Sequence, residues 1–260
     1  MKKHLLLILL ALLNFPLLGF AQVDTLRPVR IDKSTLSGIG LQQVELSHEP
    51  GRAFFQRRIY RGEDISVYVV SSQTWETEMN DFGIDELVFM YNGTAKVTPN
   101  GEQPVHFKTG EFFFIPKGYT GKWAIEAGDN YHYELSVITT ERADSTKKSS
   151  SLLPRLLDKT KLSGVDLDLE EKGVYHELLE SGIEMDIYLQ GEQPRELQMT
   201  DHRQEQLIAL LAGQVTMTDL DGQQHIFYTG DYFILPKGYS GTWKSEGHGL
   251  VKTLIVQKTS

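Results

Sequence analysis

Short apolar runs follow one another along most of the chain, and several of them are closed by a glycine or a proline. The runs are rich in β-branched and aromatic residues, which favour strands. In the first half they cover residues 65–70, 87–91, 112–115 and 131–138, and in the second half 185–189, 207–211, 232–235 and 250–256. Asn100-Gly101 and Asp221-Gly222 are typical of tight hairpin turns. The pattern predicts an all-β sandwich or barrel.

The same unit is built twice. The stretch GEFFFIPKGYTGKW at 110–123 returns 120 residues later, without a gap, as GDYFILPKGYSGTW at 230–243. The predicted strands of the two halves follow in the same order. A repeat of this length indicates two copies of one structural unit, which we place at residues 34–140 and 161–260.

Two segments lie outside the repeat. Residues 22–33 are predicted to form a loosely held polar arm, and residues 141–160 a linker that is charged and serine-rich at its start. A short helix is expected over residues 151–161, just before the second copy.

The N-terminus has the pattern of a secretory signal. Lys2 and Lys3 precede the apolar run 5–13, and a small-residue cleavage site ends at Ala21. The apolar run is shorter than the roughly 20 residues that span a bilayer, which disfavours a transmembrane anchor. We therefore predict a signal peptide over residues 1–21 and a periplasmic or secreted protein, with no membrane contact after cleavage.

Composition excludes several kinds of site. The chain has no cysteine, so disulfides and thiolate metal sites are excluded. Its net charge is −9 and it contains no dense basic run, which disfavours nucleic acid as a partner.

Two spaced motifs carry a family resemblance. The second cupin motif begins with a glycine; five residues separate this glycine from a proline, and one residue separates the proline from a second glycine. The first motif ends with a glutamate and a glycine that are separated by six residues. Both occur twice, with an amide replacing the acid in the second copy: Gly110, Pro116, Gly118, Glu86 and Gly93, then Gly230, Pro236, Gly238, Gln206 and Gly213. The chain thus resembles the cupin superfamily, and the longer repeated run is similar to the subgroup of (S)-ureidoglycine aminohydrolase. The resemblance implies two tandem cupin barrels (double-stranded β-helix, or jelly-roll) after a cleaved signal peptide.

The resemblance also implies where a metal would bind. Typical cupins hold a divalent ion with two histidines and the glutamate of the first motif and a histidine of the second. Gly121 and Gly241 occupy the second-motif histidine position. Depending on the gap, the first-motif histidine positions fall on Met79 and Asp81 or Asn80 and Phe82, and in the second copy on Met199 and Asp201 or Thr200 and His202. We therefore expect no metal in the standard place and no cofactor; Mn or another divalent ion requires ligands from other positions.

The candidate ligand-binding side chains follow from strand alternation. Glu86 shares a strand face with Val88 and Met90, so it is expected to point into the first barrel. There it is either an acid/base or ligand anchor, or a structural carboxylate. Trp123 and Trp243 share parity with the two glycines, which suggests either an aromatic cavity floor or plain core.

His132 and Lys252 are taken as equivalent positions in the last strand of each copy, and the aminohydrolase resemblance implies a basic residue there. Glu134 is expected on the opposite face from His132. Lys117 and Lys237 are expected in solvent. The full candidate set is Glu86, Asp81, Trp123, His132, Gln206, His202, Trp243 and Lys252.

Three functions remain open. The first is an exported bicupin that lacks the usual metal ligands and binds a small polar molecule in a barrel cavity. The second is a hydrolase like ureidoglycine aminohydrolase, acting on a small ureido or amide compound, which export disfavours. The third is a non-catalytic structural or dimerising module, with a homodimer through the barrel sheets. No residue is assigned a catalytic role, and the sequence does not decide which barrel is functional.

Overall fold

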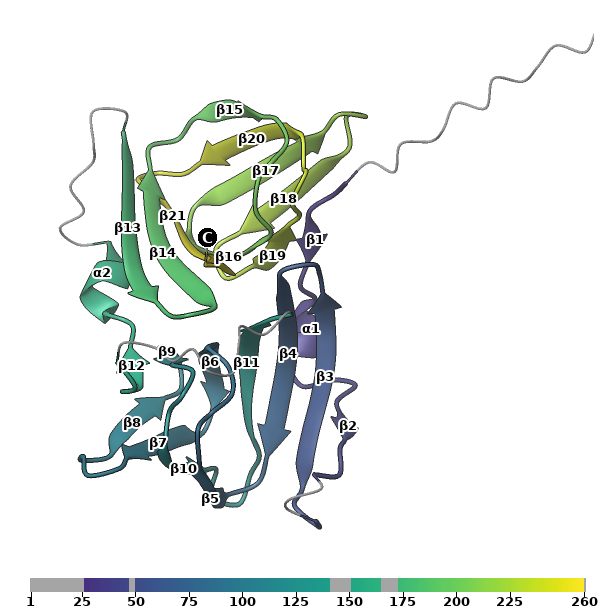
Figure 1. The fold of residues 1–260 in the computed structure, drawn as a ribbon. Helices are drawn as coiled ribbons and strands as arrows, with labels where there is room; N and C mark the ends of the chain where they lie inside the picture. Colours follow the sequence, from purple (N-terminus) through teal and green to yellow (C-terminus); the bar gives the residue numbers. More distant parts are fainter. Residues whose placement is uncertain (1–25, 47–49, 141–150, 165–172, 260) are drawn as a thin grey trace, which may run out of the picture.

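The computed structural model describes residues 26–46, 50–140, 151–164 and 173–259. The predicted signal peptide and residues 141–150 of the linker lie outside these ranges. Strands dominate the described residues, and they form two barrels that lie one above the other (Figure 1). The predicted all-β fold of two barrels is confirmed.

The first barrel consists of a large and a small sheet. The large sheet has the order β12-β9-β6-β11-β4-β3-β2, with strands β2 (Gln42–Gln43), β3 (Phe54–Arg61), β4 (Ile65–Ser72), β6 (Glu86–Asn92), β9 (Phe112–Ile115), β11 (His132–Thr139) and β12 (Arg155–Leu156). The small sheet has the order β5-β10-β7-β8, with strands β5 (Trp75–Met79), β7 (Thr94–Pro99), β8 (Val105–Lys108) and β10 (Gly121–Glu126).

The second barrel repeats this plan. Its large sheet has the order β1-β19-β16-β21-β14-β13, with strands β1 (Val29–Arg30), β13 (Val174–Ser181), β14 (Met185–Glu192), β16 (Gln206–Ala212), β19 (Tyr232–Leu235) and β21 (Val251–Lys258). Its small sheet has the order β15-β20-β17-β18, with strands β15 (Glu196–Met199), β17 (Gln214–Asp219), β18 (Gln224–Tyr228) and β20 (Gly241–Glu246). The helices are α1 (Lys33–Leu36) and α2 (Lys159–Ser163). No described helix has the length and apolar character needed to cross a membrane.

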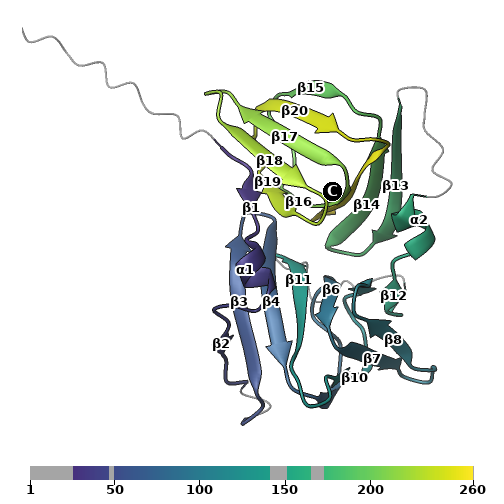
Figure 2. The ribbon, with the colours of Figure 1, turned by 180° about the vertical axis from the view of Figure 1, so that it is seen from behind.

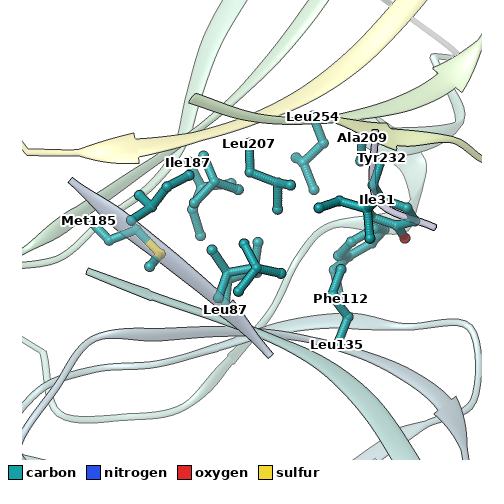
Figure 3. Packing of buried hydrophobic residues seen from close by; sticks show 14 of the residues in the cluster. Ile31, Leu87, Phe112, Leu135, Met185, Ile187, Leu207, Ala209, Tyr232 and Leu254 are labelled. Carbon is teal, nitrogen blue, oxygen red and sulfur yellow. The ribbon is translucent and has the colours of Figure 1, made fainter. Parts of the chain in front are cut away.

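The large sheets of the two barrels pack face to face. In β6, Val88 and Met90 face the interior of the first barrel, whereas Leu87 and Phe89 face the second barrel. Figure 3 shows Leu87, Leu135 and Phe112 opposite side chains of the second barrel, among them Ile187, Leu207 and Leu254. Because both faces of these strands are buried, they read as continuous apolar runs rather than alternating ones. This packing occupies the flat sheets within one chain, so a homodimer would have to use other surfaces.

Each barrel receives an edge strand from the segment that precedes the other (Figures 1 and 2). In the N-terminal arm, β1 pairs with β19 of the second barrel, and Ile31 is buried in the interface between the barrels. The expectation of a loosely held arm is therefore wrong for residues 29–31. A strand edge offers unpaired N–H and C=O groups, and the arm satisfies them.

The end of the linker behaves in the same way. Strand β12 pairs with β9 of the first barrel, and Leu157 is buried beside it. The helix expected over residues 151–161 is wrong in its start, because α2 begins only at Lys159. Asp158 caps this helix by accepting hydrogen bonds from the N–H groups of Thr160 and Lys161.

Buried carboxylates fasten each barrel to a hairpin of the other. Glu205 of the second barrel accepts hydrogen bonds from three backbone N–H groups of the β3–β4 turn: Glu63 at 3.2 Å, Asp64 at 3.3 Å and Ile65 at 2.9 Å. Tyr60 Oη donates to the same carboxylate at 2.9 Å. We call this arrangement the Glu205 clamp.

The reciprocal clamp uses Asp85 of the first barrel, which accepts from the N–H of Glu184 at 2.6 Å in the β13–β14 turn. Beside it, Lys117 Nζ forms an ion pair with Glu184 Oε1 at 2.8 Å, and both side chains are buried. The expectation that Lys117 is solvated is therefore wrong. The turn position of Lys117 lies against the second barrel, which sequence spacing could not reveal. Lys237 is exposed and pairs with Glu63.

Candidate functional site

The interior of the first barrel contains an open cavity of about 380 Å³. Its walls are largely aromatic and aliphatic, with a few polar groups: Leu46, Arg52, Phe54, Gln56, Tyr68, Val70, Trp75, Met79, Phe82, Ile84, Glu86, Trp123, Glu134, Ser136 and Ile138. This size and this mixture of apolar wall and sparse polar groups are typical of small-molecule sites.

Two carboxyl groups line this cavity. Glu86 lies at the start of β6, on the face that its alternation with Val88 and Met90 predicts, and Glu134 lies on the neighbouring strand β11. Ser136, between them on β11, donates a hydrogen bond to Glu86. Burial, and next the negative charge of Glu134, raise the pKa of Glu86 from its ordinary 4.5 to about 8. Glu86 therefore holds its proton at neutral pH.

This raised pKa makes stability depend on pH. A carboxyl whose pKa is higher in the folded chain stabilises it fully below its ordinary pKa, and that contribution is lost as the pH rises from 4.5 towards 8. Glu86→Gln keeps the neutral form at every pH. We expect the free energy of unfolding of Glu86→Gln, relative to that of wild type, to increase by about 2 kcal/mol between pH 5 and pH 9. The full pKa shift would give a larger value, but water in the cavity screens part of the charge. Urea unfolding at the two pH values measures this; a difference that does not change with pH would contradict it.

His132 stands behind Glu134. Its Nδ1 accepts a hydrogen bond from the Ser72 N–H at 3.0 Å. Its Nε2 lies 3.6 Å from Glu134 Oε2. His132 is itself buried and is not part of the cavity wall. The expectation that Glu134 faces away from His132 is wrong, because residues two apart in a strand point to the same side.

Several polar atoms around the cavity are buried without a hydrogen bond to any described residue. They include Glu134 Oε2 and Trp123 Nε1, whose side chains are both about 5% exposed. In the second barrel, by contrast, Trp243 Nε1 donates to Glu192 at 2.8 Å. The residue at the place of Glu192 in the first barrel is Ser72, which bonds His132 instead. A buried polar group without a partner is costly, so these atoms call for a ligand or water.

One wall is formed by a cation stacked on aromatic rings. The guanidinium carbon of Arg52 lies 3.3 Å from the centroid of Trp75 and 5.2 Å from that of Phe54. Phe82 packs against Trp123 with ring centroids 5.8 Å apart, and Trp123 and Trp75 lie on the neighbouring strands β10 and β5. The cavity therefore offers several flat apolar surfaces.

The second barrel has a smaller cavity, of about 230 Å³, whose polar groups are largely paired with one another. Glu192 accepts from Arg195 at 2.8 Å as well as from Trp243. Gln206 donates to Gln257 at 2.7 Å. His202 lies in the wall, and burial lowers its pKa below the ordinary value. His202 Nε2 has no hydrogen bond to a described residue, but the indole of Trp243 is paired with a carboxylate, unlike that of Trp123 in the first barrel.

Lys252 does not reach either cavity. Its Nζ donates to the carbonyl oxygens of Leu162 and Ser163 at the end of α2. The equivalence with His132 is wrong by one residue: His132 pairs with Ser72, whereas in the second barrel Val251 pairs with Glu192. The preceding loop is one residue shorter, and a shift of one residue turns a side chain to the other face.

The residues at the standard metal positions do not fit a metal. A Cβ at Gly121 would lie 2.2 Å from the carbonyl oxygen of Thr98 and 2.6 Å from Tyr119 Oη, and at Gly241 the same contacts occur with Thr218 and Tyr239. Asp81 is exposed in a turn with φ of 59°, outside the cavity wall, and its place in the wall is taken by Met79 and Phe82. Among the described residues no three histidine, aspartate or glutamate side chains converge on one point.

Of the predicted site residues, the structure brings Glu86 and Trp123 together in one cavity and Gln206, His202 and Trp243 in the other. Sequence reasoning missed Glu134, Ser136 and Arg52. Glu134 could have been found by counting its parity with His132. Ser136 and Arg52 carry no motif, and only the closed barrel places them near Glu86.

Comparison with known proteins identifies the fold. Residues 65–133 and 186–253 match the family model described as EutQ-like cupin domain. A protein of unknown function from Pseudomonas syringae pv. tomato superposes with a TM-score of 0.61 at 18% identity, covering 88% of this chain and 98% of that one. A cupin 2 conserved barrel domain protein from Leptotrichia buccalis gives 0.58 at 14% identity, covering 92% and 99%. Salicylate 1,2-dioxygenase from Pseudoaminobacter salicylatoxidans, in its adduct with gentisate, gives 0.57 at 11% identity, covering 89% and 81%. At these identities the solved structures show the fold alone. No curated protein sequence matches significantly.

Proposed function

Because the chain belongs to the family of EutQ-like cupin domains, we propose that its function lies in a barrel interior and that it binds a small organic molecule in the cavity of the first barrel. Two observations together carry this proposal. The barrel has an open cavity of about 380 Å³, and two buried atoms of its wall, Glu134 Oε2 and Trp123 Nε1, have no hydrogen bond to a described residue. A ligand that donates a hydrogen bond to Glu134 Oε2 and accepts one from Trp123 Nε1 would remove the free-energy cost of burying these two atoms without hydrogen bonds.

The first barrel is the better candidate for a binding site than the second. In the second barrel, Arg195 and Trp243 already satisfy the buried Glu192. A ligand there would have to break these contacts before making its own. In the first barrel Trp123 Nε1 and Glu134 Oε2 have no hydrogen bond to a described residue, so a ligand that bonds them has less to displace.

A cavity-filling variant tests this proposal. Ser136 occupies the place of Ile255 in the second barrel, as their pairing with Val88 and Ile208 shows. Ser136→Ile should therefore fold while narrowing the cavity. In a thermal-shift screen against small metabolites, a ligand at about 100 times its Kd should stabilise wild type by about 2.7 kcal/mol, or raise Tm by roughly 5–10 °C. The shift should disappear in Ser136→Ile.

The matched control is Ile255→Val, which alters the second barrel at the same place and should leave the shift unchanged. If no compound raises Tm, or if every shift survives Ser136→Ile, the first barrel is not the binding site.

A hydrolase like ureidoglycine aminohydrolase is the alternative that motif similarity raises. Metal-dependent hydrolysis at the standard cupin position finds no support in the side chains present, since Gly121 and Gly241 leave no room for a ligand there. A dimerising module is the other alternative. It would have to use surfaces beyond the large sheets, which pack on each other within the chain.

We also propose that the protein acts outside the cytoplasm, on the basis of the sequence of residues 1–21. The protein expressed with its own N-terminus in a Gram-negative host should be recovered from the periplasmic fraction or the medium, beginning at Gln22. Cell fractionation and N-terminal mass spectrometry check this, with a chain starting at Gln22 after an initiator methionine as the cytoplasmic control. Recovery of uncleaved protein from the cytoplasm would contradict export.

A further inference from the structure

We infer that the ligand of the first-barrel cavity is a small organic cation, a primary amine or amidine carried on a flat apolar body. This inference rests on the proposed function and names the class of molecule that the cavity selects.

The first step is the charge of the cavity wall. Its ionisable side chains are Arg52, Tyr68, Glu86 and Glu134. Arg52 is held against Trp75 by stacking, while the two acids lie on neighbouring strands with Ser136 between them. Burial keeps the proton on Glu86 near neutral pH, as its raised pKa shows. A positive charge on the ligand would balance negative charge on this pair of buried carboxyl groups.

The second step is the hydrogen-bonding capacity of the acids. An ionised carboxylate only accepts hydrogen bonds. Glu134 Oε2 is buried and has no hydrogen bond to a described residue, and His132 Nε2 lies 3.6 Å from it. An ammonium or amidinium group supplies N–H donors together with the charge. Charge-assisted hydrogen bonds of this kind are about twice as strong as neutral ones.

The third step is the shape of the walls. Four aromatic residues present rings to the cavity: Phe54, Trp75, Phe82 and Trp123. Aromatic faces attract organic cations and pack against flat groups. A metal ion is a poor alternative, because the described residues offer no group of three acidic or histidine ligands, and hard cations need about six oxygen ligands.

Three probes of one size separate charge from shape: benzylamine, benzyl alcohol and benzoate. We expect benzylamine to bind at neutral pH, benzyl alcohol to bind at least 10-fold more weakly, and benzoate not to bind detectably. Calorimetric titration gives the affinities, and tryptophan fluorescence reports contact with the wall. Glu134→Gln should weaken benzylamine binding by 10-fold or more, whereas Glu86→Gln, which replaces a carboxyl that is already neutral, should weaken it less. Glu126→Gln, which changes an exposed glutamate on β10, is the matched control and should leave the affinity unchanged.

The possible outcomes separate a failure of this inference from a failure of the proposed function. If benzyl alcohol or benzoate binds as tightly as benzylamine, and Ser136→Ile abolishes the binding, the cavity is a binding site but does not select cations. The same conclusion follows if the metabolite screen yields a ligand sensitive to Ser136→Ile that has no cationic nitrogen. If neither the probes nor the screen gives binding that depends on Ser136, the proposed function fails and the inference fails with it.

Discussion

Glu205→Ala should unfold at a Tm roughly 10 °C below that of wild type. The Glu205 clamp accepts three backbone N–H groups and one tyrosine hydroxyl from the other barrel. Its removal leaves four donors at a buried junction, and hydrogen bonds to a charged group contribute about 1.5–3 kcal/mol each but do not add fully. We therefore expect a loss of about 3–5 kcal/mol, measured by differential scanning calorimetry and urea unfolding.

A second substitution tests the same junction from its other side. A Cβ on Gly62 would lie 2.0 Å from Glu205 Oε2, so Gly62→Ala should displace the carboxylate and lower Tm as well. The control is Glu63→Ala in the same turn, whose side chain is 67% exposed and forms a surface ion pair with Lys237. Its effect should stay within about 1 kcal/mol. Equal stability of Glu205→Ala and Glu63→Ala would show that the clamp does not hold the barrels together.

Gly121→His should destabilise the first barrel rather than create a metal site. Any side chain at this position would place its Cβ 2.2 Å from the Thr98 carbonyl oxygen and 2.9 Å from Pro99 Cα. Backbone atoms cannot move aside cheaply, so the cost should be about 3 kcal/mol or more. Gly121→Ala should cost nearly as much, because the clash arises at Cβ.

Gly249→Ala is the control, since a Cβ there has no neighbour within 4 Å, and it should change stability by less than about 1 kcal/mol. Unfolding in the presence of Zn²⁺ or Mn²⁺ completes the test. A Gly121→His variant of wild-type stability that binds one metal ion per chain would show that the glycine merely replaced a ligand and that the site had room for it.

The two barrels have nearly the same arrangement of strands but different side chains in their interiors. Trp123 and Trp243 occupy equivalent places, yet only Trp243 finds a carboxylate, because Glu192 stands where the first barrel has Ser72. Glu134 and Ser136 correspond by register to Thr253 and Ile255. These few exchanges leave Trp123 Nε1 without a hydrogen bond to a described residue in one interior and pair the equivalent Trp243 with a carboxylate in the other.

Sequence patterns determined the strands, the two-fold repeat and the barrel family. The runs at 112–115 and 232–235 became strands with those bounds, because β-branched and aromatic runs between turn residues have few other folds available. The inward placement of Glu86 and Trp123 also followed from the sequence, since alternation is a local property of a strand.

The tertiary structure decided the features that depend on how the sheets close into barrels and on the register of strands that are separated by loops. A loop shortened by one residue turned Lys252 away from the cavity. The swapped strands β1 and β12 and the burial of Lys117 depend on the contact between the barrels. Glu86 and Glu134 are 48 residues apart in the chain, and they line one cavity because they lie on the neighbouring strands β6 and β11. No local propensity encodes such distances, so the cavity chemistry on which the proposed function rests emerged only once the barrel had closed.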